Sequence, residues 1–196
     1  MQIVVIDQLG DHLLQPQEDT LFLVLLDQQA KQGQLKVDLT FVKPSVSCHL
    51  IFIGRLAKDS SWQLESNMKH LVDHTSCMTD VYLSQADRSR VDYFGQIHIG
   101  AKAFATKSFL MEQSLSLGQS IFNRSRPILE IFNNKVKASH SASSSRLNET
   151  DLFYLMSRGL NRSEAEKLLE EAFFNKILDT IKSAPAKKMI QEYLAC

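Results

Sequence analysis

The chain has 196 residues, and its 22 Lys and Arg balance 22 Asp and Glu, so its formal charge is zero. A neutral chain has no electrostatic support for nucleic-acid binding. The longest apolar run, Leu21 to Leu26, is too short to span a bilayer, and Met1 to Ile6 lacks the basic segment of a signal peptide. We therefore expect a globular protein of the cytoplasm that binds neither nucleic acid nor membranes.

The chain is a succession of strand-like runs up to about Ser145. In Leu35 to Val42, for example, Leu, Val and Phe alternate with Lys, Asp and Thr, which is typical of a strand with one buried face. Few of the links carry the Asn-Gly or Asp-Gly pairs of tight hairpins. A β-sandwich and a β-solenoid both fit this pattern. The predicted strands are Ile3–Ile6, Leu21–Leu26, Leu35–Val42, His49–Ile53, Trp62–Leu71, Met78–Leu83, Val91–Ile99, Phe109–Leu117 and Ile128–Ile131.

The stretch from Pro127 to Ser145 closes this array. Pro127 to Ile131 alternates apolar and polar residues, and the pair Asn133 and Asn134 predicts a turn, because Asn tolerates left-handed backbone. A second short run, Val136 to His140, leads into Ser141 to Ser145. That serine-rich segment is the least complex part of the chain, and we interpret it as the boundary before a helical tail.

The tail has the start and stop signals of helices. Asn148 is a good N-cap, and Gly159 stands where a helix ends. Asn161 to Glu164 resembles a capping box, and apolar residues then recur at helical spacing. Ser183 to Pro185 breaks that helix, and Lys187 to Leu194 predicts one more short helix.

Three cysteines, Cys48, Cys77 and Cys196, form no C-x-x-C motif, which suits a reducing compartment. Cys48 and Cys77 are spaced so that they can be neighbours on stacked coils. Buried packing is the commoner role for such residues. The histidines His70 and His74 are four apart, but in or beside a strand they sit too far apart for easy co-ligation of a metal.

A family resemblance rests on two segments. The pattern "P-x-L-E-I, turn, V-K-C-S-H-G-A-T" is similar to the run from Pro127 to Ala142, and "L-F-Y-L-x-S-R-G" is similar to Leu152 to Gly159. Both are motifs of the SufB/SufD family, scaffold components of Suf-type iron–sulfur cluster assembly, and the SufD side is the closer. Asp87 to Ser116 also resembles two successive coils of that family. Two departures stand out, because Ala138 replaces the family's Cys and Ser141 replaces its Gly.

The resemblance implies the architecture. It favours a mainly β fold, a right-handed parallel β-helix, over residues 1–146, followed by a small α-helical domain over residues 147–196. The family's N-terminal helical region has no counterpart ahead of the first strands of this sequence. Periodicity leaves the choice between a β-sandwich and a β-solenoid open, and the resemblance favours the solenoid.

The resemblance also implies a function and partners. It indicates a non-enzymatic scaffold that docks a SufC-like ABC ATPase through its C-terminal helices. There, Leu155, Met156, Phe173 and Phe174 would be hydrophobic anchors and Arg158 would pair with an acidic group. A SufB-like or identical subunit would pair with the strands to form a dimer. The residues expected in that pairing are Pro127, Glu130 and Val136.

His140 is the candidate ligand for a cluster, since the histidine of this motif is similar to a proposed ligand at the SufB–SufD interface. Imidazole is a legitimate iron ligand, but a single histidine is not a site. A structural role for His140, through hydrogen bonds alone, is the alternative. We expect no stably bound cofactor and at most a transient iron–sulfur cluster in a complex.

Enzymatic interpretations have little support. The sequence has no P-loop, no G-x-G-x-x-G and no G-x-S-x-G motif. Polysaccharide-processing β-helices use paired carboxylates, for which Asp80, Asp87 and Asp92 are the candidates. Surface acids on strands are usually only solvated, so a carbohydrate-active β-helix is the more distant alternative. The nearer alternative is a degenerate β-helix that acts only as an assembly or regulatory partner.

Overall fold

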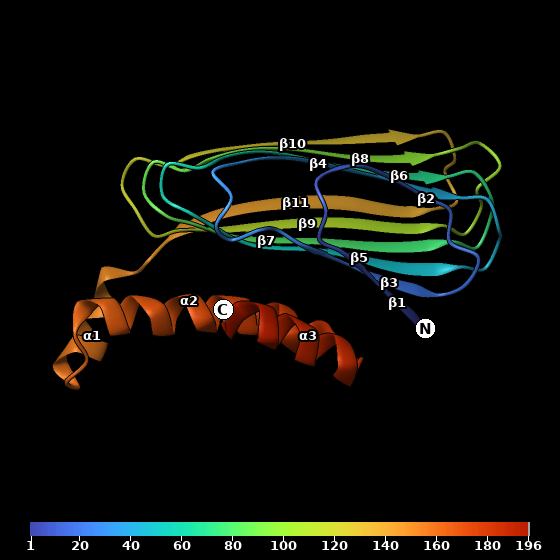
Figure 1. Ribbon diagram of the computed structural model, residues 1–196. Coiled ribbons are helices and arrows are strands. Elements are labelled where there is room, and N and C mark those ends of the chain that lie inside the picture. The colour runs from blue at the N-terminus through green and yellow to red at the C-terminus, as the bar shows by residue number, and fades with distance from the viewer. Residues whose placement is uncertain (196) are drawn as a thin grey trace.

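The computed structural model describes residues 1–195, which form a parallel β-solenoid of about five turns followed by three α-helices (Figure 1). The expected mainly β fold with helices behind it is confirmed. Odd-numbered strands form one sheet, sheet A, and even-numbered strands form the facing sheet B. The chain thus crosses from sheet to sheet at each turn, and every strand pair is parallel.

Sheet A consists of β1 (Gln2–Ile6), β3 (Thr20–Leu25), β5 (Ser47–Leu56), β7 (Ser76–Gln85), β9 (Lys107–Ser116) and β11 (Lys137–Arg146). Sheet B consists of β2 (Gly10–Leu14), β4 (Gln32–Phe41), β6 (Ser61–His70), β8 (Arg90–Ile99) and β10 (Phe122–Ile131).

Two strands depart from the sequence expectations. β2 was not predicted, because its polar and apolar residues form only a short run, and it pairs with β4 alone. Ser141 to Ser145, which the sequence analysis interpreted as the boundary before the tail, are part of a strand, because they continue β11 in register with Met111 to Leu115 directly before the helices. Parallel backbone hydrogen bonds to β9 hold this segment, and they do not depend on the side chains. The strand array therefore runs to Arg146.

The turns of the solenoid repeat the same backbone conformation. Ser45, His74 and Ala105 all have positive φ, and each donates its backbone N–H to a carbonyl of the following coil. Such left-handed residues cost about 1–3 kcal/mol each and persist only where the surrounding structure holds them, as the stack of equivalent turns does. His74 is therefore an exposed turn residue, whereas His70 lies inside the solenoid, so the two histidines do not form a pair.

The interior between the sheets is apolar, from Phe22 and Val24 through Val37 and Leu50 to Ile97. Such burial is the main stabilising term of the fold. His70 is enclosed here, stacked on Phe41 at 4.4 Å between ring centroids. Its ring nitrogens lie 2.8 Å from Thr75 Oγ1 and 3.0 Å from Ser108 Oγ, so this buried polar ring has both of its partners.

The helices are α1 (Glu149–Ser157), α2 (Arg162–Thr180) and α3 (Ala184–Ala195). The predicted caps are confirmed: the Asn148 side chain accepts a hydrogen bond from the Thr150 backbone, and Asn161 with Glu164 forms a complete capping box. Gly159 has φ of 101° and donates its N–H to Met156, which ends α1 as expected.

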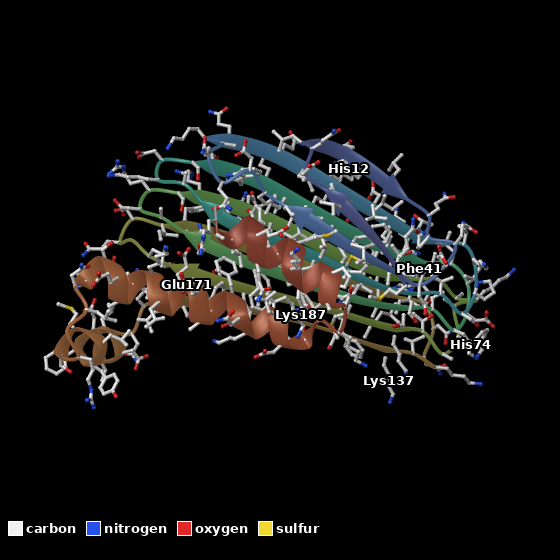
Figure 2. The ribbon with its side chains drawn as sticks, turned by 60° about the horizontal axis from the view of Figure 1, so that its bottom comes forward. His12, Phe41, His74, Lys137, Glu171 and Lys187 are labelled. Carbon is white, nitrogen blue, oxygen red and sulfur yellow. The ribbon has the colours of Figure 1, made fainter. Side chains whose placement is uncertain are left out.

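The helices α2 and α3 lie along the outer face of sheet A (Figures 1 and 2). They bury a second hydrophobic cluster against that face, in which Phe174 and Ile177 of α2 meet Leu23 and Ile51 of the sheet. Polar contacts fix the arrangement, since Glu170 pairs with Arg55 and accepts a hydrogen bond from Ser84. β11 ends at Arg146, where the sequence analysis divided the chain. The further expectation that the tail forms a separate domain stays a prediction.

Candidate functional site

The last coil, β10 with β11 and the turn between them, is the most exposed part of the solenoid. Within residues 1–195, β10 pairs only with β8 and β11 only with β9, so each has one free edge. Large apolar side chains are exposed there, namely Ile128, Leu129, Ile131 and Phe132. An open strand edge with exposed apolar residues is a template for pairing with another chain.

The register shows which side chains continue the core. Leu129 is in register with Ile97, and Ile131 with Ile99, and both isoleucines are buried. Ala138 and Val136 pack against the same interior cluster from sheet A and the turn. The hydrophobic core is therefore uncovered at this end of the solenoid.

The residues expected in subunit pairing all lie on this coil. Pro127 is half-buried and in register with Gly95, and Val136 is half-buried in the turn before β11. Glu130 is exposed on the outer face of sheet B, where its carboxylate lies 3.2 Å from His98 Nδ1. The structure brings these three residues to one end of the molecule, while their role in pairing remains a prediction.

His140 lies at the same open end. It is exposed on β11, in register with the buried Leu110, and it shares a strand face with Ala138, which packs on the interior. Among residues 1–195, no group of three or more His, Cys, Asp or Glu side chains could hold a metal ion. A cluster bound at His140 would therefore need ligands from another chain.

Glu112 is a buried acid that the sequence analysis did not single out. It sits on the inner face of β9, in register with Ala142 of the last coil, and is only 1% exposed. Burial raises the pKa of its carboxyl, and Ser125 and Asn123 partly oppose this. Neither makes a hydrogen bond of good geometry to it, since Asn123 donates instead to Ser114 at 2.7 Å. The interior thus becomes polar just below the open end.

Cys48 and Cys77 lie inside the solenoid, away from its open end. Cys48 and Cys77 are in register on β5 and β7, which confirms that they are neighbours on stacked coils. Both are buried. Burial raises the pKa of the Cys48 thiol to about 12, and it also raises the pKa of the Cys77 thiol above its usual range. Protonated, enclosed thiols are poor metal ligands and poor nucleophiles. Cys196 lies outside the residues that the structure describes.

The hairpin of α1 and α2 is the other exposed apolar surface. Phe153 is 73% exposed and Tyr154 56%, with Met156 and Leu168 also exposed beside them. The Arg158 guanidinium lies 5.3 Å from the centre of the Tyr154 ring, an arrangement that favours both groups. Leu155 is half-buried. Leu155, Met156 and Arg158 therefore remain available to a partner.

Phe173 and Phe174 are not available, and their expected role as anchors is corrected. They are 6% and 1% exposed, and Phe173 packs its ring 5.4 Å from that of Tyr82 on sheet A. Their apolar area is already used to hold α2 against the solenoid. A side chain buried in its own chain cannot anchor a partner without undocking the helix.

The three aspartates do not form a catalytic pair. Asp80 lies on the outer face of sheet A beside His49, Asp92 lies on the outer face of sheet B, and Asp87 lies in a turn. Hydrogen bonds from Arg124 lower the pKa of Asp92, and backbone N–H groups lower that of Asp87. A glycosidase acid needs a raised pKa and a facing carboxylate. The carbohydrate-active interpretation has no support here.

The fold and these surfaces define a parallel β-solenoid protein with open strand edges on its last coil and an exposed helical hairpin. Residues 18–173 match the family model described as "SUF system FeS cluster assembly, SufBD core domain". The chain therefore belongs to the SufBD family of the Suf iron–sulfur cluster assembly system.

Individual relatives agree with this assignment. The chain is 29% identical to a SufBD family protein of Synechocystis over 148 residues, which is 74% of this chain and 31% of the relative. It is 31% identical to a SufBD family protein of Staphylococcus aureus strain USA300 over 152 residues, 72% of this chain and 32% of the relative. With the iron–sulfur cluster assembly protein SufD of Escherichia coli it shares 28% identity over 105 residues, 54% of this chain and 25% of SufD. The matched part is thus about a quarter to a third of these relatives.

Within residues 1–195, no helix is both long enough and apolar enough to cross a membrane.

Proposed function

We propose that this chain is a non-enzymatic scaffold component of Suf-type iron–sulfur cluster assembly in the cytoplasm. It pairs with a SufB-like or identical subunit through its last coil and docks a SufC-like ABC ATPase through the hairpin of α1 and α2. The observation that carries the proposal is the uncovered last coil in a chain that matches the SufBD core domain.

The pairing step follows from the strand edges. β10 and β11 are each ten residues long and each presents one unpaired edge at the same end of the molecule, beside the exposed Leu129 and Ile131. A second chain that adds a strand to each sheet satisfies these backbone groups and covers the open core. His140 then comes to lie at the junction, where a cysteine of the partner can complete a transient cluster with it.

The docking step rests on the exposed side of the hairpin. Phe153, Tyr154 and Met156 form an aromatic and sulfur-containing surface on α1, and all three side chains are exposed. Aromatic residues with a neighbouring arginine are typical anchors of protein interfaces. Arg158, held on the ring of Tyr154, is the group that pairs with an acidic residue of the ATPase.

Mixing the purified chain with a SufB-like subunit and a SufC-like ATPase tests this function. Light scattering after gel filtration should show a stable complex that contains all three chains. Absence of the SufB-like subunit from every complex, together with absence of a dimer of this chain, contradicts the pairing, and absence of the ATPase contradicts the docking.

One observation favours a second candidate function. Ala138 packs inside the last coil at the position where the family pattern has Cys. A thiol that could hold sulfur or iron is thereby lost. A complex that assembles but never acquires a cluster would identify the chain as an assembly partner that lacks cluster chemistry.

A further inference from the structure

The last coil carries an excess of positive charge. β10 contains Arg124, Arg126 and Glu130, and β11 contains Lys137 and Arg146. These four cations and one carboxylate give the two open strands a formal charge of +3, whereas the whole chain is neutral. The strands at the opposite end, β1 and β2, contain no Lys or Arg. The charge is therefore concentrated at the open end.

The arginines of β10 are only partly neutralised. Arg124 and Arg126 both bind the single carboxylate of Asp92 on the adjacent strand β8. Arg90 lies beside them, with its guanidinium 4.8 Å from the centre of the Phe122 ring. Two guanidinium groups thus share one carboxylate on this part of sheet B, and a third lies beside them on the Phe122 ring.

The other cations have no carboxylate at all. Among residues 1–195, neither Lys137 nor Arg146 makes an ion pair, and Glu130 contacts His98. Lys137 lies at the start of β11, beyond the ends of the helices (Figure 2). The other residues on the same face of β11 are Ser139, Ser141, Ser143 and Ser145.

These cations stand beside the edge that an incoming strand would occupy. Arg124 and Arg126 are on the outer face of β10, since the intervening Ser125 is in register with the buried Tyr93. Side chains directly opposite each other on paired strands lie close together, so their charges decide which pairings are favourable. An incoming strand therefore places its own outer residues against these cations.

A second copy of this chain supplies only one carboxylate, Glu130, against four further cations on the same two strands. When β10 pairs antiparallel with β10 of a second copy in a register centred on Arg126, the Arg126 side chains of the two copies face each other. A register centred on Pro127 brings Arg124 to Glu130 but leaves Arg126 beside Ile128, and one centred on Ile128 brings Arg126 to Glu130 but leaves Arg124 opposite a position beyond the end of the strand. Pairing of β10 with β11 of the second copy can bring Glu130 to Lys137, but in that register the arginines face serines. Like charges at such an interface oppose association.

We propose that the last coil selects a non-identical partner whose edge strands carry carboxylates, and that Arg124, Arg126 and Lys137 determine this choice. This inference rests on the proposed pairing through the last coil. It names the chemistry of the partner: two extended strands with acidic residues on their outer faces. The basic edge at the same time keeps copies of this chain from pairing with one another.

Three versions of the chain test this selection: the wild type, a neutral variant with Arg124→Gln, Arg126→Gln and Lys137→Gln, and an acidic variant with Glu at the same three positions. A control variant carries Lys43→Glu, Lys58→Glu and Lys69→Glu, which are exposed lysines on earlier coils. Sedimentation velocity measures the association of each protein alone and in pairs, at about 0.05 M and about 0.5 M salt, where screening differs strongly.

The wild type should bind the acidic variant on the order of tenfold or more tightly than it binds itself, and salt should reduce this preference. The neutral variant should self-associate more tightly than the wild type, and the control variant should bind the wild type no better than the wild type binds itself. Equal association in all mixtures overturns the charge selection but leaves pairing through the last coil intact. Absence of association in every mixture, including the neutral variant, overturns the proposed pairing itself.

Discussion

His140 occupies the same position on β11 that Leu110 occupies on β9, so an exposed histidine follows a buried leucine from one coil to the next. In the preceding coil this position is part of the hydrophobic core. At the open end, the chain instead places an imidazole next to an uncovered part of the core. A histidine there contributes little to the stability of the isolated chain, which leaves it free for a role in a complex.

His140→Ala should therefore abolish cluster reconstitution in the complex with a SufB-like subunit and leave folding intact. The free energy of unfolding should change by less than about 0.5 kcal/mol, because the side chain is exposed. Iron content and the visible absorption of the reconstituted complex measure the first effect, and urea unfolding the second. His12→Ala, on β2 at the other end, is the matched control. Equal reconstitution in all three proteins would leave His140 as a structural residue.

The hairpin surface makes a separate prediction. Tyr154→Ala and Arg158→Glu should each weaken capture of the ATPase on the order of tenfold, because the first removes an exposed ring and the second reverses the charge held on it. Lys182→Glu, an exposed change at the far end of α2, should have no effect. A pull-down with purified ATPase measures this. Undiminished capture by both hairpin variants would place the docking surface elsewhere.

Removing the whole helical tail is not a clean test of docking. Truncation after Ser145 would uncover Leu23, Ile51 and the other residues of sheet A that α2 and α3 bury. The loss of binding would then be mixed with loss of the fold. Point changes on α1 avoid this, since α1 itself contributes only Leu152 as a fully buried residue.

Phe174 and Phe153 differ sharply in what their removal should cost. Phe174 is 1% exposed and packs against Phe173 and the Arg55 guanidinium, so Phe174→Ala should lower the free energy of unfolding by about 3–5 kcal/mol. Phe153→Ala should change it by less than about 0.5 kcal/mol, because that ring is 73% exposed. Urea unfolding followed by circular dichroism compares the two. Similar small losses would show that α2 is not docked on sheet A.

The sequence predicts the solenoid well where residues alternate and poorly where they do not. Leu35 to Phe41 alternates because sheet B buries one face only, and β4 was found there. The serines of β11 carry no such signal, since an edge strand at the open end buries almost nothing. Only the register with β9, a contact between distant parts of the chain, shows that they form a strand.

The site was partly predictable for the same reason. The family motif locates His140 and Glu130, and both lie on the open coil. It does not tell which apolar residues of the tail face the sheet, so Phe173 and Phe174 were assigned to a partner although they pack inside. Glu112 had a signal in the sequence, because it takes an inward position between Leu110 and Ser114 of an alternating strand. An acid at such a position indicates a polar interior.

His70 predicts how stability depends on pH. Burial lowers the pKa of this histidine from 6.5 to about 4, because the enclosed ring is stable only when neutral. Between these two values the unfolded chain binds a proton that the native chain does not, so stability falls as the pH falls from about 6.5 to about 4. The full effect of His70 is on the order of 3 kcal/mol.

His70→Gln should flatten this dependence, because an amide can keep hydrogen bonds to Thr75 and Ser108 but does not titrate. Urea unfolding at intervals from pH 7.5 to pH 4.5 measures it, as the difference between wild type and variant at each pH. His74→Asn is the control, since it removes an exposed imidazole and keeps a residue that tolerates the positive φ of 55° at this turn. We expect the free energy of unfolding of His70→Gln to be lower than that of the wild type at pH 7.5, and the difference between them to shrink as the pH falls. A constant difference across the range would show that His70 is not enclosed as a neutral ring.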